Sequence, residues 1–435
     1  MKKGTKITLS ILAILIALVV GALVSMDIVC TKIAKKQISQ HMADKPFDID
    51  LKMIHLMPLS QSVNILGITL TKQDEEYPLS IGIDQVTVHN VNIRRALSLG
   101  SVNLEKITLD GIDINMTVPH PEGKVELYME NTDLCVHNLS YNTGADSTLQ
   151  TGLLIDSIAT HTDSLYVHLI KQHAPTKPYG TPQDALDNLP IDMHIAQVTN
   201  KIEKMGFGLT TPLVPYGSIR LYRIVNQASN ISGDKGNHLL LQALAHLEHG
   251  GVAYLNTTFV QNKNQDVNLD FLVIGGQGSP VDEMTRPLIG ITFACDIDTI
   301  RLKAKGNKNT LDGTFVMRYH GLEVFVHPGE SPYEIINKNA QLIGSAANTL
   351  IPKANPSPLT PDNIRRYNVH ADRDPMKAYP SFMMGPIIDG LKSTMLPGLY
   401  VNKKIKTKTT LPTTLPTTLP KMSTKTSPKT NTKTE

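Results

Sequence analysis

Large aromatic side chains are scarce in this 435-residue chain, which has no Trp and only eight Phe. Apolar residues nevertheless make up 41 % of the sequence. That fraction is sufficient for a β-core, although one without large aromatic anchors. The length allows one large elongated domain or two ordinary ones.

Cysteine is also rare, and its pattern excludes a disulfide framework. Cys30, Cys135 and Cys295 form no CxxC pair and no even set. Free thiols, buried or next to lipid, are the simplest interpretation. A Cys135–Cys295 disulfide in an oxidising compartment stays open, because spacing alone does not determine pairing.

The motifs of the common enzyme classes are missing. There is no GxGxxG, no GxSxG and no GxxxxGK followed by Ser or Thr, and no helical pattern follows the glycine-rich stretch at 275–278. His246 and His249 are three residues apart in a strand-like segment, which is not the HExxH zinc motif. We therefore predict no catalytic residue, no metal site, no cofactor and no enzymatic activity; an enzyme remains a third alternative without a residue to name.

The formal net charge of +3 is unevenly distributed. Residues Val401–Glu435 contain eight Lys and one Glu, which leaves 34 basic and 38 acidic residues, a net charge of −4, in residues 1–400. A mildly acidic body gives no reason to propose a nucleic-acid partner. The tail repeats Thr-Thr-Leu-Pro from Thr409 onward, and this composition predicts a disordered basic segment.

The one long apolar run lies at the N-terminus. Ile7–Val24 spans 18 residues, is interrupted only by Thr8, Ser10 and Gly21, and follows three lysines. This length just suffices for a membrane-spanning helix, and the lysines favour a cytoplasmic start with the bulk of the protein across the membrane. A cleaved signal peptide is the alternative. A helical continuation is predicted over Thr31–Met42.

Period-two alternation dominates the rest of the chain. Ile112, Ile114, Met116 and Val118 alternate with polar residues, which indicates a strand with one dry face. Strands are predicted at Val63–Thr71, Ser80–Ile93, Val102–Val118, Val125–Met129, Leu134–Leu139, Leu153–Leu169, Ile191–Ile195, Leu239–Leu247, Val252–Val260, Val267–Ile274, Ile291–Ala304, Thr314–Tyr319 and Leu322–Val326. Lys171–Leu189 lacks periodicity and is predicted to be a loop or insertion.

A unit of the form apolar–acid–any–apolar recurs at 83–86, 104–107, 155–158 and 297–300. The alternation slips by one residue at each unit, for example from Ile81 and Ile83 to Val86 and Val88. Because a slip would turn the apolar set to the other face, each unit requires a bulge or bend that restores the register. The pattern predicts a repeating antiparallel meander.

One helix is clearly marked near the C-terminus. Ser331 to Glu334 has capping-box spacing, and an apolar stripe follows at Tyr333, Ile336, Ala340, Ile343, Ala347 and Leu350. We expect this helix to cover exposed backbone at the end of the sheet. The apolar segment Tyr379–Leu399, punctuated by Pro and Gly, packs on its own domain or contacts a membrane or partner.

These patterns predict a mainly β protein: a long antiparallel sheet, curved or partly open, with an N-terminal transmembrane helix and a C-terminal capping helix. The expected parts are an anchor (1–30), a β-rich body (31–330), a capping helix with an apolar segment (331–400) and a tail (401–435). The sheet can hide its apolar face by closing, by packing a second sheet, or by curling into a groove for an acyl chain; periodicity does not decide between them.

Several stretches together resemble the AsmA-like family. Asn64-Ile-Leu-Gly-Ile-Thr-Leu70, Ile83-Asp-Gln-Val86 and 101–115 (SVNLEKITLDGIDIN) resemble its N-terminal part, and 311–326 (LDGTFVMRYHGLEVFV) resembles its C-terminal region. So do Ala347–Ile351, Asn355-Pro356, Arg373-Asp-Pro375 and Gly390-Leu-Lys392. The likeness covers about Met1 to Leu399 and leaves out the tail.

This resemblance implies a single-pass inner-membrane protein whose bulk lies in the periplasm. The family is similar to bridge-like lipid-transfer proteins and is associated with outer-membrane assembly and lipid homeostasis. The expected function is binding or transfer of phospholipid in support of the outer membrane. The alternative is a structural or adaptor protein that acts on outer-membrane assembly proteins and carries no lipid. From the alternation, candidate lipid-groove residues are Ile112, Ile114, Met116, Leu269, Phe271 and Val273, each of which is also a plausible core residue.

Overall fold

The computed structural model describes residues 27–40, 47–57, 61–72, 74–90, 101–142, 152–189, 192–214, 216–277 and 281–395. The predicted anchor at Ile7–Val24 and the tail at 401–435 lie outside these residues. Among the helices that are described, none is both long enough and apolar enough to cross a membrane. Residues 27–40 are helical, which confirms the predicted helical continuation over 31–40; its last two predicted residues lie outside the described ranges.

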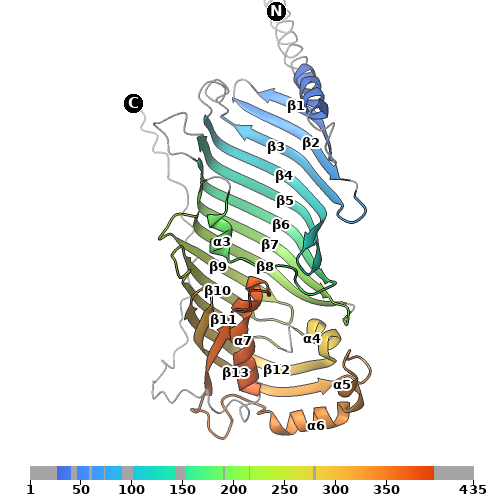
Figure 1. The fold of residues 1–435 in the computed structure, drawn as a ribbon, viewed down its shortest axis with the longest axis vertical. Helices are drawn as coiled ribbons and strands as arrows, with labels where there is room; N and C mark the ends of the chain where they lie inside the picture. Colours follow the sequence, from blue (N-terminus) through green and yellow to red (C-terminus); the bar gives the residue numbers. More distant parts are fainter. Residues whose placement is uncertain are drawn as a thin grey trace, which may run out of the picture.

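The described body is one open 14-stranded sheet whose spatial order is the order of the chain (Figure 1). β1 and β14 are its two edges, so the sheet is not closed. The strands are β1 (Asp48–Met57), β2 (Ser62–Lys72), β3 (Leu79–His89), β4 (Ser101–His120), β5 (Gly123–Asn142), β6 (Gly152–Lys171), β7 (Met193–Thr210), β8 (Gly217–Ser232), β9 (His238–Leu247), β10 (Val252–Val260), β11 (Val267–Ile274), β12 (Ile291–Gly306), β13 (Thr310–Val326) and β14 (Arg366–Asp372).

The predicted mainly β, open-sheet class is confirmed, with differences in detail. β5 and β13 are each continuous where two strands were predicted, because the interrupting polar residues pair in the ladder. β1, β8 and β14 were not predicted, and β7 is much longer than the predicted Ile191–Ile195. β8 escaped prediction because Asn226, Gln227 and Ser229 interrupt its apolar alternation.

Every neighbouring pair of strands is antiparallel except β6 and β7, which run parallel. The prediction of an uninterrupted antiparallel meander is therefore wrong at this pair. Two parallel neighbouring strands need a connection that carries the chain back to the end of the sheet at which the first strand began. Residues 172–189, called here the crossing segment, begin this return and include α3 (Pro182–Asp187), a short helix within the predicted loop.

The predicted bulges occur, and neighbouring strands slip at the same level. Ile83 pairs with Ile68 and Gln85 with Leu66, which places Asp84 beside Gly67, a residue with φ of +59°. On its other side Asp84 approaches Gly111 (φ +63°), where a Cβ would lie 2.5 Å from the Asp84 carboxylate. Because adjacent strands shift together, apolar residues on both sides of the bulge keep the same face of the sheet.

The units at 104–107 and 155–158 slip together in the same way, whereas the fourth unit contains a local register shift. Asn138, with φ of +51°, lies between the units at 104–107 and 155–158, and its side-chain amide donates to Asp156 over 2.7 Å. At the fourth unit the β12–β13 ladder shifts between Ile297 and Thr299.

Side chains from helices bind the exposed backbone at both ends of the sheet. At β1, the Leu56 N–H donates to Asp27 (2.8 Å) and the Ile54 N–H donates to Thr31 (2.9 Å), both in the helix at 27–40. At the other end, β14 pairs only with the first half of β13. Asn348 of α6 (Ala340–Leu350) both accepts from the Val324 N–H (2.8 Å) and donates to the Val324 carbonyl (2.9 Å). The expectation that this helix covers a sheet end agrees with these bonds.

The predicted start of that helix is wrong. α5 (Glu334–Lys338) begins at Glu334 without a side-chain cap, and a break at Asn339 separates it from α6. Ser331 instead accepts from the Tyr333 N–H and is held by Asn337, so no capping box forms. In the predicted stripe, the central members are turned toward the protein, whereas Tyr333 and Leu350 are exposed.

The apolar C-terminal segment forms α7 (Tyr379–Met395), which lies across one face of the sheet (Figure 1). Tyr379, Phe382 and Ile387 are buried against β10 to β14. A further helix, α4 (Asp282–Ile289), contacts β8 and β12. Of the two alternatives for the segment, packing on its own domain is the one observed for its described part.

Candidate functional site: an apolar concave face

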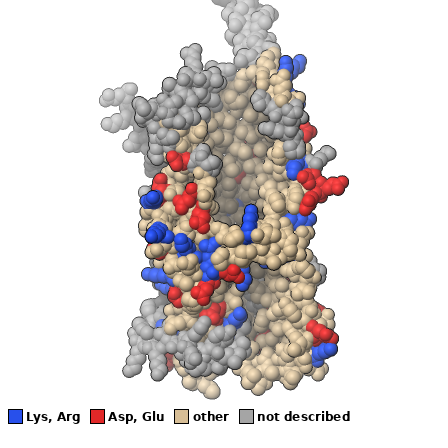
Figure 2. All heavy atoms as spheres, in the orientation of Figure 1, with Lys and Arg blue, Asp and Glu red and all other residues tan. Residues whose placement is uncertain are grey.

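The face that carries α7 is concave and apolar, and in its β1–β5 part no described element covers it. Figure 2 shows it hollowed, with the visible wall of the hollow almost free of charged side chains. Register rows cross this part of the sheet with apolar residues at every step. Three of these rows are Ile54–Ile65–Val86–Leu109–Leu134, Leu56–Val63–Val88–Ile107–Val136 and Ile49–Leu70–Ile81–Ile114–Met129.

Burial differs sharply between the two ends of this face. Most side chains in the β1–β5 rows are only half-buried. At the other end of the sheet, the paired residues Leu302 of β12 and Phe315 of β13 are 0 % exposed beneath α7. The same apolar surface is therefore an uncovered groove at β1–β5 and a packed core at β11–β14.

The crossing segment marks the boundary between the two. It starts beside the β4–β5 turn, where the Thr176 N–H donates to the Pro121 carbonyl. It ends near the β10–β11 turn, where Thr181 donates to Gln265 (3.0 Å) and Gln265 donates to Asp184 (2.6 Å). Figure 2 shows a band with many charged side chains across the hollow at this level.

The crossing segment is also bonded to the residues that precede α7. The Tyr179 N–H donates to the Pro375 carbonyl over 2.8 Å, and Arg373 donates to the Tyr179 carbonyl. Arg373 stacks on the ring of Tyr379 at 5.5 Å. Burial raises the pKa of Tyr379 to about 12, so its hydroxyl stays neutral in this contact. The crossing segment and α7 thus form one connected cover over the far part of the face.

The structure places the six predicted groove residues in both environments. Ile112, Ile114 and Met116 lie on β4 in the uncovered part, Ile112 being buried by its neighbours and the other two half-buried. Leu269, Phe271 and Val273 lie on β11, with Leu269 and Phe271 in the cluster that α7 covers. The β4 residues therefore fit a groove wall, and the β11 residues are core in this structure.

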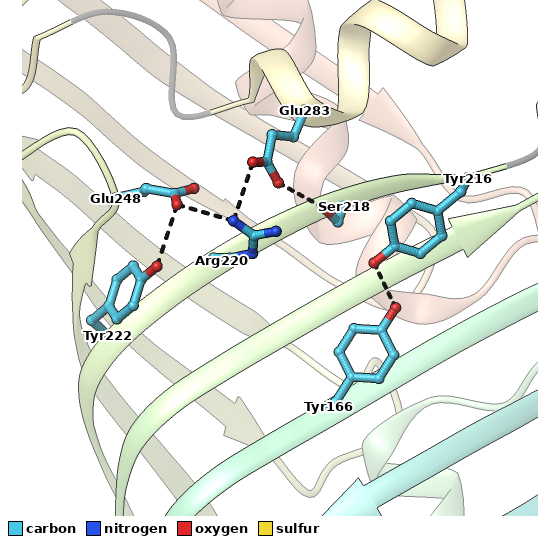
Figure 3. Close-up of polar contacts among 7 residues, drawn as sticks. All are labelled: Tyr166, Tyr216, Ser218, Arg220, Tyr222, Glu248 and Glu283. Atoms are coloured by element: carbon cyan, nitrogen blue, oxygen red, sulfur yellow. Dashed lines mark hydrogen bonds and ion pairs between the residues drawn. The ribbon is translucent and has the colours of Figure 1, made fainter.

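An aromatic and charged cluster that was not predicted from the sequence lies on the opposite, convex face (Figure 3). Leu165 packs with the concave cluster of Ile202 and Ile224, so the alternate residue Tyr166 points the other way. Its hydroxyl contacts the Tyr216 hydroxyl at 2.7 Å, and its ring covers Gly206 and Gly208. Burial and the Tyr216 hydroxyl raise the pKa of Tyr166. The glycines opposite Tyr166 were the available sequence signal.

A charged group lies beside these tyrosines. Arg220 contacts Glu248 (3.3 Å) and Glu283 (3.2 Å), which raises its pKa, chiefly through the charge of Glu283. Glu283 also accepts from Ser218, so this group joins β8 to α4. Because both carboxylates are paired with Arg220, we interpret these residues as a structural contact that holds α4 against β8.

Elsewhere, the described residues contain no cluster of three or more His, Cys, Asp or Glu side chains that could hold a metal ion. All three cysteines are free, so the Cys135–Cys295 disulfide is not formed. Burial raises the pKa of the Cys295 thiol to about 11, which leaves it protonated and unreactive at neutral pH. Searches of protein families, of curated proteins and of solved structures return no match to this chain.

Proposed function

We propose that this protein binds the acyl chains of phospholipid on the uncovered concave face and carries lipid between membrane compartments. The observation that carries the proposal is the set of unbroken apolar rows across β1–β5, which no described element covers. A contiguous apolar surface of this kind usually marks a binding site. Each CH₂ group taken out of water by it contributes about 0.8 kcal/mol.

The setting of the protein is part of the same proposal. The apolar run Ile7–Val24 would hold the chain in the inner membrane, with the sheet in the periplasm, as the resemblance to AsmA-like proteins implies. The helix at 27–40 follows this run closely and is bonded to β1. In this proposal the uncovered end of the groove would be the end nearest the anchor, where membrane lipid is available. In this role the protein would support assembly or integrity of the outer membrane.

Site-specific photo-crosslinking in cells tests the proposal. A benzophenone amino acid at Leu109 on the groove wall should capture phospholipid. The same amino acid at the adjacent Asp110, which is exposed on the other face, is the matched control. Lipid captured at Leu109 and not at Asp110 supports the groove; no lipid at either position, in a folded protein, contradicts it.

An adaptor role without lipid carriage is the second candidate, and α7 provides the observation for it. Met384 and Ile388 on its outer side are 47 % and 45 % exposed, four residues apart. This spacing places them on one helix face, where a protein could dock. If a photo-crosslinking amino acid at Met384 captured a membrane-assembly protein and the one at Leu109 captured no lipid, this role would be favoured.

A further inference from the structure

A polar interruption crosses four neighbouring strands of the apolar concave face. Thr132, Thr160, Thr162, Asn200 and Asn226 occupy adjacent register positions on β5 to β8. Thr132 pairs with Thr162, Thr160 with Asn200, and Asn200 with Asn226. We call these five residues the polar island.

The polar island lies on the inner face because its strand neighbours do. On β7, Val198 belongs to one concave apolar cluster and Ile202 to another, and Asn200 alternates with both on the same side. On β8, Asn226 is likewise two residues from Ile224. The island therefore separates two apolar clusters of the same groove.

Hydrogen bonding within the island is incomplete. The Thr132 hydroxyl donates to the Thr162 hydroxyl over 3.0 Å. The side-chain carbonyl oxygen of Asn200 is buried and has no hydrogen-bond partner among the described residues. A buried acceptor without a partner costs about 1–3 kcal/mol, and filling the groove with an acyl chain alone would leave that cost in place.

The island is also uncharged. Lys201 and Glu203, the nearest charged residues along β7, are exposed and alternate to the convex face. An anionic phosphate would find no cation here, so a lipid headgroup is a poor match. The group that fits a free carbonyl oxygen is a neutral donor, an O–H or an amide N–H.

From this geometry, and on the basis of the proposed function, we infer that the polar island selects lipids that carry a neutral hydrogen-bond donor in their acyl or linkage region. Hydroxylated acyl chains and amide-linked acyl chains both belong to this class. Diester phospholipids with plain chains offer only acceptors there. The island then acts as a specificity filter within a groove that holds acyl chains in general.

A competition experiment on the full-length protein tests this inference. The protein is incubated with equal amounts of three lipids that share a phosphoethanolamine headgroup. They are phosphatidylethanolamine with plain chains, its 3-hydroxyacyl analogue, and ceramide phosphoethanolamine. Mass spectrometry of the retained lipid should show about fivefold enrichment of one or both donor-bearing lipids, since a single net hydrogen bond is worth about 1 kcal/mol. Which of the two is enriched distinguishes a hydroxyl from an amide.

Asn200→Leu removes the polar contact while keeping similar volume on an otherwise apolar wall. We expect it to abolish the enrichment, to retain the plain diester lipid, and to leave the lipid-free protein at least as heat-stable as the wild type. Asn115→Leu, at an exposed position on β4, is the matched control and should keep the enrichment. Equal retention of all three lipids by the wild type overturns the inference and leaves the proposed function standing. A folded wild type that retains none of them overturns both.

Discussion

Two residues predicted for the same groove should respond differently to a buried charge. Ile114 lies on the uncovered wall, so Ile114→Asp should leave the fold intact and remove most of the retained lipid, because a carboxylate repels acyl chains. Phe271 packs against the cluster beneath α7, so Phe271→Asp should lower the free energy of unfolding by about 3–5 kcal/mol. Chemical denaturation and lipid extraction of both variants measure the two effects. Unfolding of Ile114→Asp would show that the β4 wall is also core.

His370 on β14 should make stability depend on pH. Its ring contacts Asp312 at 2.8 Å and Asp372 at 3.0 Å, and the Asp312 contact is the main reason that its pKa is raised. Because the pKa is raised in the folded state, the protonated ring stabilises the fold. This stabilisation is complete below the unfolded-state pKa of about 6.5 and is lost as pH rises through the folded-state pKa.

The melting temperature of His370→Gln should therefore differ from that of the wild type more at about pH 6 than at about pH 9. His173→Gln, at an exposed position of the crossing segment, serves as the control. An equal difference in melting temperature at both pH values would show that the charged contacts of His370 do not stabilise the protein.

Individual residues also show the limit of sequence reasoning. Alternation correctly assigned Ile114 and Phe271 to strands with apolar partners. It could not tell groove from core, because the difference is made by α7, more than 100 residues after Phe271. Polar residues such as Asn200 escaped attention because one Asn in a strand carries no signal until its neighbours on other strands are known.

At the scale of elements, the protection of the sheet edge by α6 is open to test. Asn348→Ala removes both bonds to the Val324 backbone, which is buried there. We expect a loss of about 1–3 kcal/mol in the free energy of unfolding, as for buried groups left without partners. Gln341→Ala, at an exposed position of the same helix, should change it by less than about 0.5 kcal/mol. Equal effects in urea titrations would mean that the edge does not depend on Asn348.

The crossing segment should open locally when its cap is removed. Thr181 caps α3 through Asp184 and also donates to Gln265, so Thr181→Ala breaks both contacts. Amide hydrogen exchange should then become faster in 172–189 and stay unchanged in β4 and β5. Faster exchange throughout the sheet would show that the segment is an integral part of the core.

This crossover was beyond prediction for a physical reason. Lys171–Leu189 has no periodicity because it is a covering strand-to-strand connection, whose contacts are made by Thr181 and Tyr179 with distant residues. The parallel pairing of β6 with β7 depends on the end of the sheet at which the chain re-enters after the crossing segment, and no local pattern in β6 or β7 records that. Elements with strong alternation, such as β10 and β11, were predicted to the residue.

At the scale of the whole molecule, one open sheet combines a covered half that stabilises it with an uncovered half that is free to bind. The covered half contains the residues of lowest exposure, including Leu302, Leu311 and Phe315. The uncovered half leaves a continuous apolar wall in water, which costs free energy unless something occupies it. Lipid is the occupant that the wall fits in our account.

Native mass spectrometry of the gently purified full-length protein, with lipid extraction from the same sample, decides whether the uncovered groove holds lipid. We predict that the wild type binds phospholipid at a defined stoichiometry and that the Ile114→Asp variant does not retain it. A folded, monodisperse protein without lipid would contradict the account and would turn attention to protein partners of α7.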